Sequence, residues 1–259
     1  MKILLYQVDA FTNKLFSGNP AAVCPLEKWL PDQQLQAIAA ENNLAETAFF
    51  VQSENGYHLR WFTPNSEVDL CGHATLASAY ILFTKMGVKD TSLNFQTKSG
   101  KLVVNLEVNR LTLDFPSRPA IPCPIPESLI EGLGQIPDQV LLARDYLVVY
   151  STEKIVKSLK PKMDSFLDFD ALGVIATARG ENSDFVSRFF APKVGVPEDP
   201  VTGSAHCTLI PYWSQELGKK QLHALQVSSR GGELFCEDFG DRVKISGEAV
   251  LYCEGAIYL

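Results

Sequence analysis

Short runs rich in β-branched and aromatic residues occur along the whole chain, and turn-forming residues bound most of them. This pattern predicts many strands, spread over both halves of the chain. In the first half the predicted strands are 2–11, 21–24, 46–52, 57–62, 92–97, 101–108 and 110–115. In the second half they are 140–150, 171–177, 185–191, 226–229, 233–237, 242–246 and 249–257.

Helical patterns are fewer. Residues 31–42 are predicted to form a helix, because Pro31 suits a first helical turn and apolar residues follow at helical spacing. Two longer helices are predicted, 72–86 and 203–217 (the latter beginning at Thr202 or Gly203), and each stops at a glycine. Two short helices are predicted over 126–131 and 152–159. The pattern thus predicts more strands than helices.

Residues 116–126 contain five prolines, so this stretch can be neither a helix interior nor a central strand. It lies near the midpoint of the chain and is interpreted as the crossing between two halves. The predicted domains are therefore 1–115 and 121–247.

The two halves share a sequence pattern. Arg-Trp-Phe-Thr-Pro at 60–64 corresponds to Arg-Phe-Phe-Ala-Pro at 188–192. Each copy is followed by an acidic residue, Asp69 or Asp199, and then by the glycine that opens a long helix. This order of elements predicts two similar domains related by a pseudo-twofold axis, with equivalent loops facing one another across a cleft.

Composition limits the partners. The formal net charge is −7, with the acidic residues dispersed, which argues against nucleic acid or an anionic membrane as partner. No apolar run approaches the roughly 18 residues of a membrane span, and the first residues do not resemble a signal peptide, so a cytoplasmic protein is expected. The six cysteines form no CxxC pair and are expected to be reduced thiols. No metal-binding, nucleotide or phosphate-loop signature is present, so no metal, NAD, ATP or pyridoxal phosphate is expected.

Two glycine-started helices suggest an anion site. If their first turns, at Gly72 and Gly203, point to one place, their unpaired N–H groups and positive dipole ends suit a substrate carboxylate. Ser204 can add a hydrogen bond there, or support the first turn of its helix.

Three residues are candidates for proton transfer. Glu46 has mostly apolar sequence neighbours, and desolvation of a carboxyl group moves its pKa towards the range of a general acid/base. His73 follows the first helix-opening glycine, where the helix dipole disfavours the cation and therefore predicts a neutral imidazole. Asp199 precedes the second helix, where a carboxylate is also a common N-cap. Each of these residues also has a purely structural interpretation.

Four segments together resemble the PhzF family of phenazine-biosynthesis-like isomerases. They are Phe-Ser-Gly-Asn-Pro-Ala-Ala-Val at 16–23, Asn-Leu-Ala-Glu-Thr-Ala-Phe at 43–49, Asp-Leu-Cys-Gly-His-Ala-Thr at 69–75 and Glu-Asp-Pro-Val-Thr-Gly-Ser-Ala at 198–205. The resemblance implies the diaminopimelate-epimerase-like fold of the α+β class, in which each of two domains is a sheet curled around a central helix. It also implies a homodimer, and a last strand, about 249–259, that returns to the first domain.

The resemblance also implies roles for residues. Glu46 would be the general acid/base of a cofactor-independent isomerisation, and His73 and Asp199 would orient the substrate or relay protons. The substrate carboxylate would be bound by Ser204 and the helix starts at Gly72 and Gly203. Asn19 is expected near the cleft. In the phenazine enzyme itself, the substrate is trans-2,3-dihydro-3-hydroxyanthranilate.

The chain departs from the phenazine enzymes at the loop that reads Cys-Gly-His-Ala-Thr, where those enzymes tend to have alanine before the glycine and proline after the histidine. The chain therefore resembles the broad uncharacterised branch of the family. Cys71 also falls where related amino-acid epimerases keep a catalytic thiol. Three hypotheses follow: an isomerase of a small carboxylate that uses Glu46, a racemase or epimerase that uses Cys71 with Asp199, and a non-catalytic binding protein on the same fold.

Overall fold

The computed structural model describes all residues from 1 to 259, and the chain divides into two compact units. Unit 1 comprises residues 1–114 and 246–259, and unit 2 comprises residues 115–245. None of the helices has both the length and the apolar character that crossing a membrane requires.

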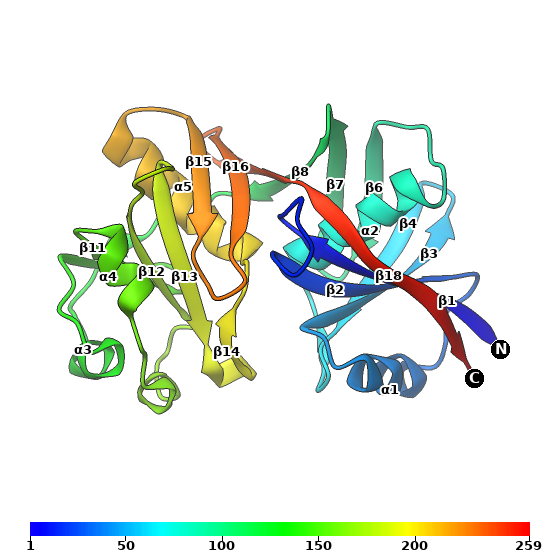
Figure 1. Ribbon diagram of the computed structural model, residues 1–259, viewed down its shortest axis with the longest axis horizontal. Helices are drawn as coiled ribbons and strands as arrows, with labels where there is room; N and C mark the ends of the chain where they lie inside the picture. The colour runs from blue at the N-terminus through cyan, green and yellow to red at the C-terminus, as the bar shows by residue number, and fades with distance from the viewer. The chain divides into compact units, whose positions relative to one another are not determined.

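Unit 1 is a curled sheet built around one helix (Figure 1). Its helices are α1 (Asp32–Asn42) and α2 (Gly72–Thr84). Its strands are β1 (Lys2–Ala10), β2 (Asn19–Leu26), β3 (Glu46–Ser53), β4 (Gly56–Phe62), β5 (Glu67–Val68), β6 (Ser92–Thr97), β7 (Gly100–Glu107), β8 (Arg110–Pro116, which ends just past the boundary) and β18 (Ala249–Tyr258).

Strand pairing joins the two ends of the chain. β18 pairs antiparallel with β1 along its whole length, with Lys2 opposite Tyr258 and Ala10 opposite Ala249 (Figure 1). β1 pairs with β2, β2 runs parallel to β3, and β3 and β4 are antiparallel. β4 then runs parallel to β6, and β6 pairs antiparallel with β7.

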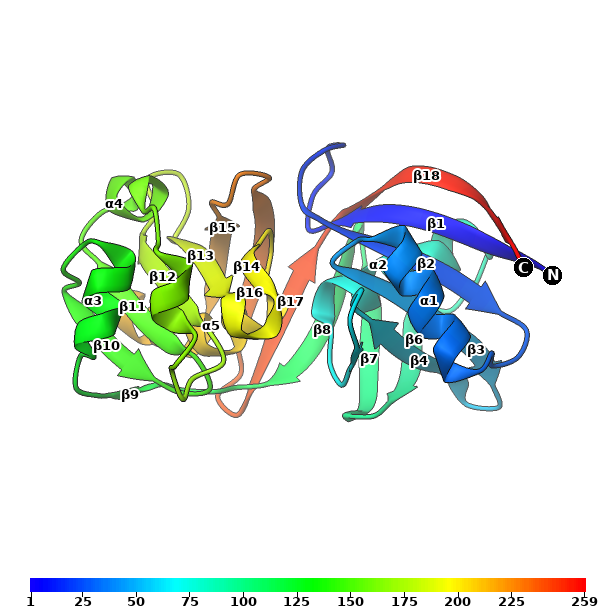
Figure 2. The same ribbon diagram turned by 90° about the horizontal axis from the view of Figure 1, so that it is seen from below.

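The central helix α2 is apolar on all sides. It packs against β1, β2, β3, β7 and β18, so strands from distant parts of the sheet surround it. Besides His73 near its start, the polar residues Thr75 and Ser78 are buried in it, and each hydroxyl donates to the carbonyl four residues earlier, at 2.5 and 2.8 Å. Because these hydrogen bonds satisfy both hydroxyls within the helix, burying the two side chains costs little free energy. The shorter helix α1 lies outside the sheet and packs on it through Leu35 and Ile38 (Figure 2).

Unit 2 repeats this arrangement around α5 (Gly203–Leu217). Its other helices are α3 (Glu127–Leu133), α4 (Glu153–Ser158) and the 3-10 turns η1 (Met163–Phe166) and η2 (Pro192–Val194). Its strands are β9 (Ile121–Pro122), β10 (Gln139–Leu142), β11 (Tyr146–Tyr150), β12 (Val174–Arg179), β13 (Phe185–Ala191), β14 (Val196–Asp199), β15 (Gln221–Gln226), β16 (Gly232–Asp238) and β17 (Arg242–Gly247, which crosses the boundary).

The pairings of unit 2 follow those of unit 1 in kind and order. β10 and β11 are antiparallel, β11 and β12 parallel, and β12 and β13 antiparallel. β13 is then parallel to β15, which pairs antiparallel with β16. The repeated sequence pattern therefore corresponds to a repeated strand arrangement. On the outside of this sheet α3 and α4 cover a second core, to which Leu129 and Val156 contribute (Figure 2).

Helix α5 continues through Pro211, which has no N–H group to donate. The carbonyl four residues earlier, that of Cys207, instead accepts a hydrogen bond of 2.9 Å from the backbone N–H of Arg118. The helix ends at Gly218, whose φ of 64° is the left-handed conformation that glycine adopts without strain. An external donor thus allows the predicted helix 203–217 to form across a proline.

The two long helices and α1 lie where the sequence pattern placed them, with boundaries shifted by one or two residues. The prediction of one strand over 140–150 is wrong, because residues 143–145 form a turn between β10 and β11. In this turn the N–H of Ala143 donates to the carbonyl of Asp145, and Arg144 pairs with the Asp145 carboxylate. Polar residues with their own local partners interrupt the strand.

The predicted strand 226–229 is also wrong, because the strand is β15 and ends at Gln226. The side-chain amide of Gln226 forms two hydrogen bonds of 2.8 Å. Its oxygen accepts from the N–H of Thr202, and its nitrogen donates to the carbonyl of Asp199. Beyond it the chain turns, and the hydroxyl of Ser228 donates to the carbonyl of Pro200 at 2.8 Å. These side-chain hydrogen bonds to the segment that precedes α5 are tertiary contacts. The alternation of apolar and polar residues cannot predict them, so the end of the strand was misplaced.

Candidate active site

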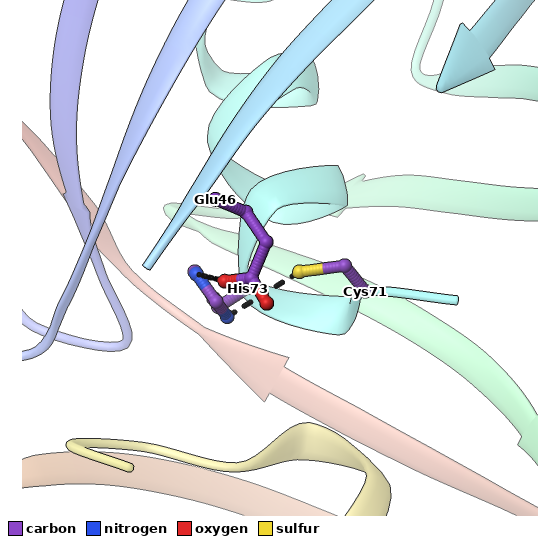
Figure 3. A group of neighbouring side chains, drawn as sticks. All are labelled: Glu46, Cys71 and His73. Carbon is purple, nitrogen blue, oxygen red and sulfur yellow. Dashed lines mark hydrogen bonds and ion pairs between the residues drawn. The ribbon is translucent and has the colours of Figure 1, made fainter. Parts of the chain in front are cut away.

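In unit 1, three titratable side chains meet at the N-terminus of α2: Glu46, Cys71 and His73, named here the Glu46–Cys71–His73 cluster (Figure 3). Glu46 is the first residue of β3, Cys71 is the N-cap of α2, and His73 is the second residue of that helix. The sequence predicted Glu46 and His73 as site residues and Cys71 as an alternative.

His73 lies between the other two. Its Nε2 is 3.1 Å from Oε2 of Glu46, and its Nδ1 is 3.5 Å from Sγ of Cys71 (Figure 3). The amide of Asn19 lies 3.2 Å from the same Nδ1. Cys71 and His73 are buried, whereas the Glu46 side chain keeps 16% of its surface exposed. Glu46 is therefore the member of the cluster that a substrate can reach most easily.

The start of β2 places Asn19 against His73. Asn19 is fully buried and follows Gly18, whose φ of 68° favours glycine. A Cβ at Gly18 would lie 2.3 Å from the carbonyl oxygen of Ala10, so no larger residue fits without a backbone shift. The Gly-Asn-Pro turn thus directs Asn19 to the start of α2.

Burial and charge act on the two buried groups. Burial raises the pKa of the Cys71 thiol to about 11, and the nearby Glu46 charge adds to this, so the thiol keeps its proton at neutral pH. For His73, burial opposes the cation, but the electrostatic and hydrogen-bonding contacts with the Cys71 sulfur and the Glu46 carboxylate favour it, and the pKa of His73 is raised well above its ordinary value. The expectation of a neutral His73 is therefore wrong, because these acidic neighbours outweigh burial and the helix dipole.

A positively charged His73 beside Glu46 has a chemical consequence. The cation lies 3.1 Å from the Glu46 carboxylate and stabilises negative charge at this place. The first N–H groups of α2 lie at the same place and suit an anion. The cluster therefore combines a proton acceptor with groups that stabilise negative charge.

In unit 2, a second polar group surrounds the start of α5. The Thr202 hydroxyl donates to the Asp199 carboxylate at 2.5 Å, and Gln226 contacts both residues. Ser204 accepts a 3.0 Å hydrogen bond from Nη2 of Arg144, whose guanidinium is held by the buried Asp145. The predicted residues Asp199, Gly203 and Ser204 thus lie together within this unit.

Sequence reasoning missed Arg144, Thr202 and Gln226. Arg144 and Asp145 lay inside the predicted strand 140–150. Two adjacent charged residues in an otherwise apolar stretch were the only local indication of a turn. Thr202 was noted only as a helix start. Gln226 carried no local signal, because its partners are more than 20 residues away in the chain.

A cavity of about 580 Å³ in unit 1 is lined by residues of β1, β2 and β3 such as Ile3, Leu26 and Phe50, and none of the predicted site residues lines it. The charged side chains at this cavity, among them Lys2 and Glu27, are exposed, whereas the Glu46–Cys71–His73 cluster brings three titratable groups together at a helix N-terminus and is therefore the better candidate site.

Comparison with known proteins gives consistent results along the whole chain. The family model described as "Phenazine biosynthesis-like protein" matches residues 8–255. The "Uncharacterized isomerase PA2770" of Pseudomonas aeruginosa is 52% identical over 259 residues, which cover all of both chains. A crystal structure described as a phenazine biosynthesis protein of the PhzF family, from Enterococcus faecalis, superposes with a TM-score of 0.98 at 47% identity and covers all of both chains.

More distant structures share the fold. A probable proline racemase from Agrobacterium radiobacter matches with a TM-score of 0.67 at 10% identity, covering 99% of this chain and 93% of that one. At this identity the likeness concerns the fold only. It confirms the predicted diaminopimelate-epimerase-like, α+β architecture.

Proposed function

Because this chain belongs to the phenazine biosynthesis-like protein family, we propose that it is an isomerase that moves a proton within a small carboxylate substrate, with Glu46 as the general acid/base and without a cofactor. Several relatives of about 50% identity over their full length are named isomerases. The observation that carries the proposal is the 3.1 Å contact between Glu46 and a buried His73 whose raised pKa favours the cation.

The proposed reaction has two proton transfers. The Glu46 carboxylate takes a proton from a substrate carbon, and the electrons of the broken C–H bond move into a shifted double bond. The same carboxyl group then returns the proton to another carbon of the same molecule. His73, 3.1 Å from Glu46, stabilises negative charge that develops on the substrate.

The substrate carboxylate is proposed to bind to helix N-termini. The start of α2, at Gly72, offers unpaired N–H groups beside the His73 cation. Ser204 and Gly203 at the start of α5, with the guanidinium of Arg144 next to Ser204, support binding of an anion by unit 2. Asp199, which the Thr202 hydroxyl holds in place, is proposed to orient the substrate or relay a proton.

The test is proton NMR in D2O with a panel of cyclic and amino-substituted small carboxylates, including trans-2,3-dihydro-3-hydroxyanthranilate. The wild type is expected to shift or exchange a carbon-bound hydrogen of one compound, and Glu46→Gln is expected to lose this activity by a factor of at least about 100. Glu41→Gln, which removes an exposed carboxylate from α1, serves as the matched control and should keep the activity. Wild-type turnover in Glu46→Gln contradicts the proposal.

A second candidate is a racemase or epimerase that uses Cys71, with Asp199 as the other acid/base. It is favoured by the position of the Cys71 thiol, 3.5 Å from His73 at the start of α2, and by the epimerase-like fold. In this case Cys71→Ala abolishes solvent exchange at a stereocentre. Exchange that continues in Cys71→Ala removes this candidate.

A further inference from the structure

The Glu46–Cys71–His73 cluster brings three different kinds of metal-binding side chain close together. One ligand atom from each residue, the thiol sulfur, an imidazole nitrogen and a carboxylate oxygen, lies within 4.8 Å of the others. We propose that these three residues bind one borderline or soft divalent cation, such as Zn²⁺, and that the ion inhibits the enzyme reversibly by occupying its acid/base.

The donor chemistry suits zinc better than magnesium or calcium. Thiolate and imidazole are preferred by Zn²⁺, whereas Mg²⁺ and Ca²⁺ require mostly oxygen ligands. Three protein ligands of mixed kind with a fourth position open are typical of non-structural zinc sites. Without Cys71, the cluster would offer only an imidazole and a carboxylate.

The geometry of Cys71 and His73 already matches that of two ligands on one ion. With zinc distances of about 2.3 Å to sulfur and about 2.0 Å to nitrogen, two ligands in a tetrahedral site are about 3.5 Å apart. The Sγ of Cys71 lies 3.5 Å from Nδ1 of His73. The two residues are fixed relative to each other by the first turn of α2, so the pair needs little rearrangement.

Glu46 must move to complete the site. Its Oε2 contacts Nε2, on the opposite side of the imidazole ring, so the carboxylate has to turn towards the Cys71 side. Glu46 is the least buried of the three and its side chain has three rotatable bonds, which permits this movement. The site is thus half-formed by α2 and closed by the catalytic carboxylate.

Binding has a defined chemical balance. The S–H bond of Cys71 and the Nδ1–H bond of the His73 imidazolium break, a sulfur–metal and a nitrogen–metal bond form, and the two released protons pass to the buffer. The carboxylate of Glu46 then coordinates the ion and can no longer accept a proton from substrate. This inhibitory consequence rests on the proposed role of Glu46, whereas the binding itself does not.

The test measures binding without any substrate. Untagged protein carrying Cys253→Ser, to remove the exposed thiol, and His223→Gln, to remove the surface His223–Glu233 pair, is titrated with Zn²⁺ against a chromophoric chelator. The same protein is titrated with Co²⁺ while the absorption spectrum is recorded. We expect one ion per chain and a sulfur-to-cobalt charge-transfer band in the near ultraviolet.

Added substitutions separate this site from other thiols. Cys71→Ser is expected to weaken zinc binding more than about tenfold, since loss of even an outer-shell partner costs 10–100-fold, and to remove the cobalt band. Cys207→Ser removes another buried thiol and should change neither. If Cys71→Ser does not fold, His73→Gln removes a second ligand and is expected to weaken zinc binding by a similar factor.

Equal zinc affinity with and without Cys71, or a cobalt complex without the sulfur band, overturns the proposed site. Failure of this experiment leaves the proposed isomerase function intact, because no turnover is measured. Conversely, an active Glu46→Gln protein would contradict the proposed function and the inhibition, but would leave zinc binding by Cys71 and His73 to be decided by the titration alone.

Discussion

Arg60 and Arg188 make the same contact in the two units. Each donates from Nε and Nη2 to both carboxylate oxygens of a glutamate on the next strand, Glu67 or Glu198, at 2.7–2.9 Å. Each guanidinium also lies about 5 Å from the ring of the phenylalanine two residues later. The repeated Arg-x-Phe sequence therefore encodes a repeated ion pair that fixes the strand leading to each central helix.

The two arginines are predicted to differ in their contribution to stability. Arg188 also donates to the carbonyls of Val156 and Leu159 at the end of α4, whereas the additional partner of Arg60 is the exposed Asp32. We expect Arg188→Met to lower the free energy of unfolding by about 3 kcal/mol, since it leaves buried acceptors without donors. Arg60→Met should cost about half as much, because an exposed ion pair contributes little. Urea unfolding of both variants measures this, and an equal or larger loss in Arg60→Met would contradict it.

Gly18 and Gly87 form a matched pair for testing the turn that positions Asn19. Both have φ near 68°, but a Cβ would strike the backbone of Ala10 at Gly18 and would meet nothing within 4 Å at Gly87. Gly87→Ala should therefore cost only the backbone strain, about 1 kcal/mol. Gly18→Ala should cost at least about 2 kcal/mol more, since the backbone has to shift. Thermal unfolding compares the two, and similar losses would show that the close approach at Gly18 is unimportant.

The charge of His73 is predicted to depend on Glu46. Removal of the negative charge in Glu46→Gln takes away one of the groups that favour the imidazolium, so the pKa of His73 should fall. Because the folded-state pKa is raised, the ion pair stabilises the fold fully below the unfolded-state pKa and loses its effect as pH rises through the folded value. NMR titration of the His73 ring nitrogens in wild type and Glu46→Gln checks this. An unchanged pKa in the variant would mean that Glu46 does not hold the charge.

His206 is predicted to limit stability in mild acid. It is fully buried, and burial lowers its pKa to about 4, although its Nδ1–H donates to the carbonyl of Thr202 at 2.8 Å. The unfolded chain takes up the proton near pH 6.5, so stability rises from about pH 4 to about pH 6.5 and then levels off. This difference corresponds to about 3 kcal/mol.

His206→Gln removes the titrating group. Between about pH 4 and pH 6.5 it should reduce the slope of the unfolding free energy against pH by an amount that corresponds to about one proton. Denaturant unfolding at a series of pH values provides the measurement. A variant whose stability changes with pH as steeply as the wild type would show that other groups cause the acid sensitivity.

The sequence by itself determined the elements and the motifs. The helices, the glycine that stops α5, the Arg-x-Phe repeat and the segments around Asn19, Glu46, His73 and Asp199 depend on residues that are neighbours in the chain. Propensity, periodicity and capping act over such short distances, so they can be read locally. The errors at 140–150 and 226–229 occurred where Asp145 and Gln226 bind partners that strand periodicity does not reveal.

Only the tertiary structure decided the rest. The pairing of β18 with β1 joins residues more than 230 positions apart, and the contact between Glu46 and His73 spans 27 positions. It is this contact, together with the contact to Cys71, that favours the charged form of His73 against burial and against the expectation from the helix dipole alone. Electrostatic environment depends on every group within a few ångströms, and the fold, not the local sequence, brings those groups together.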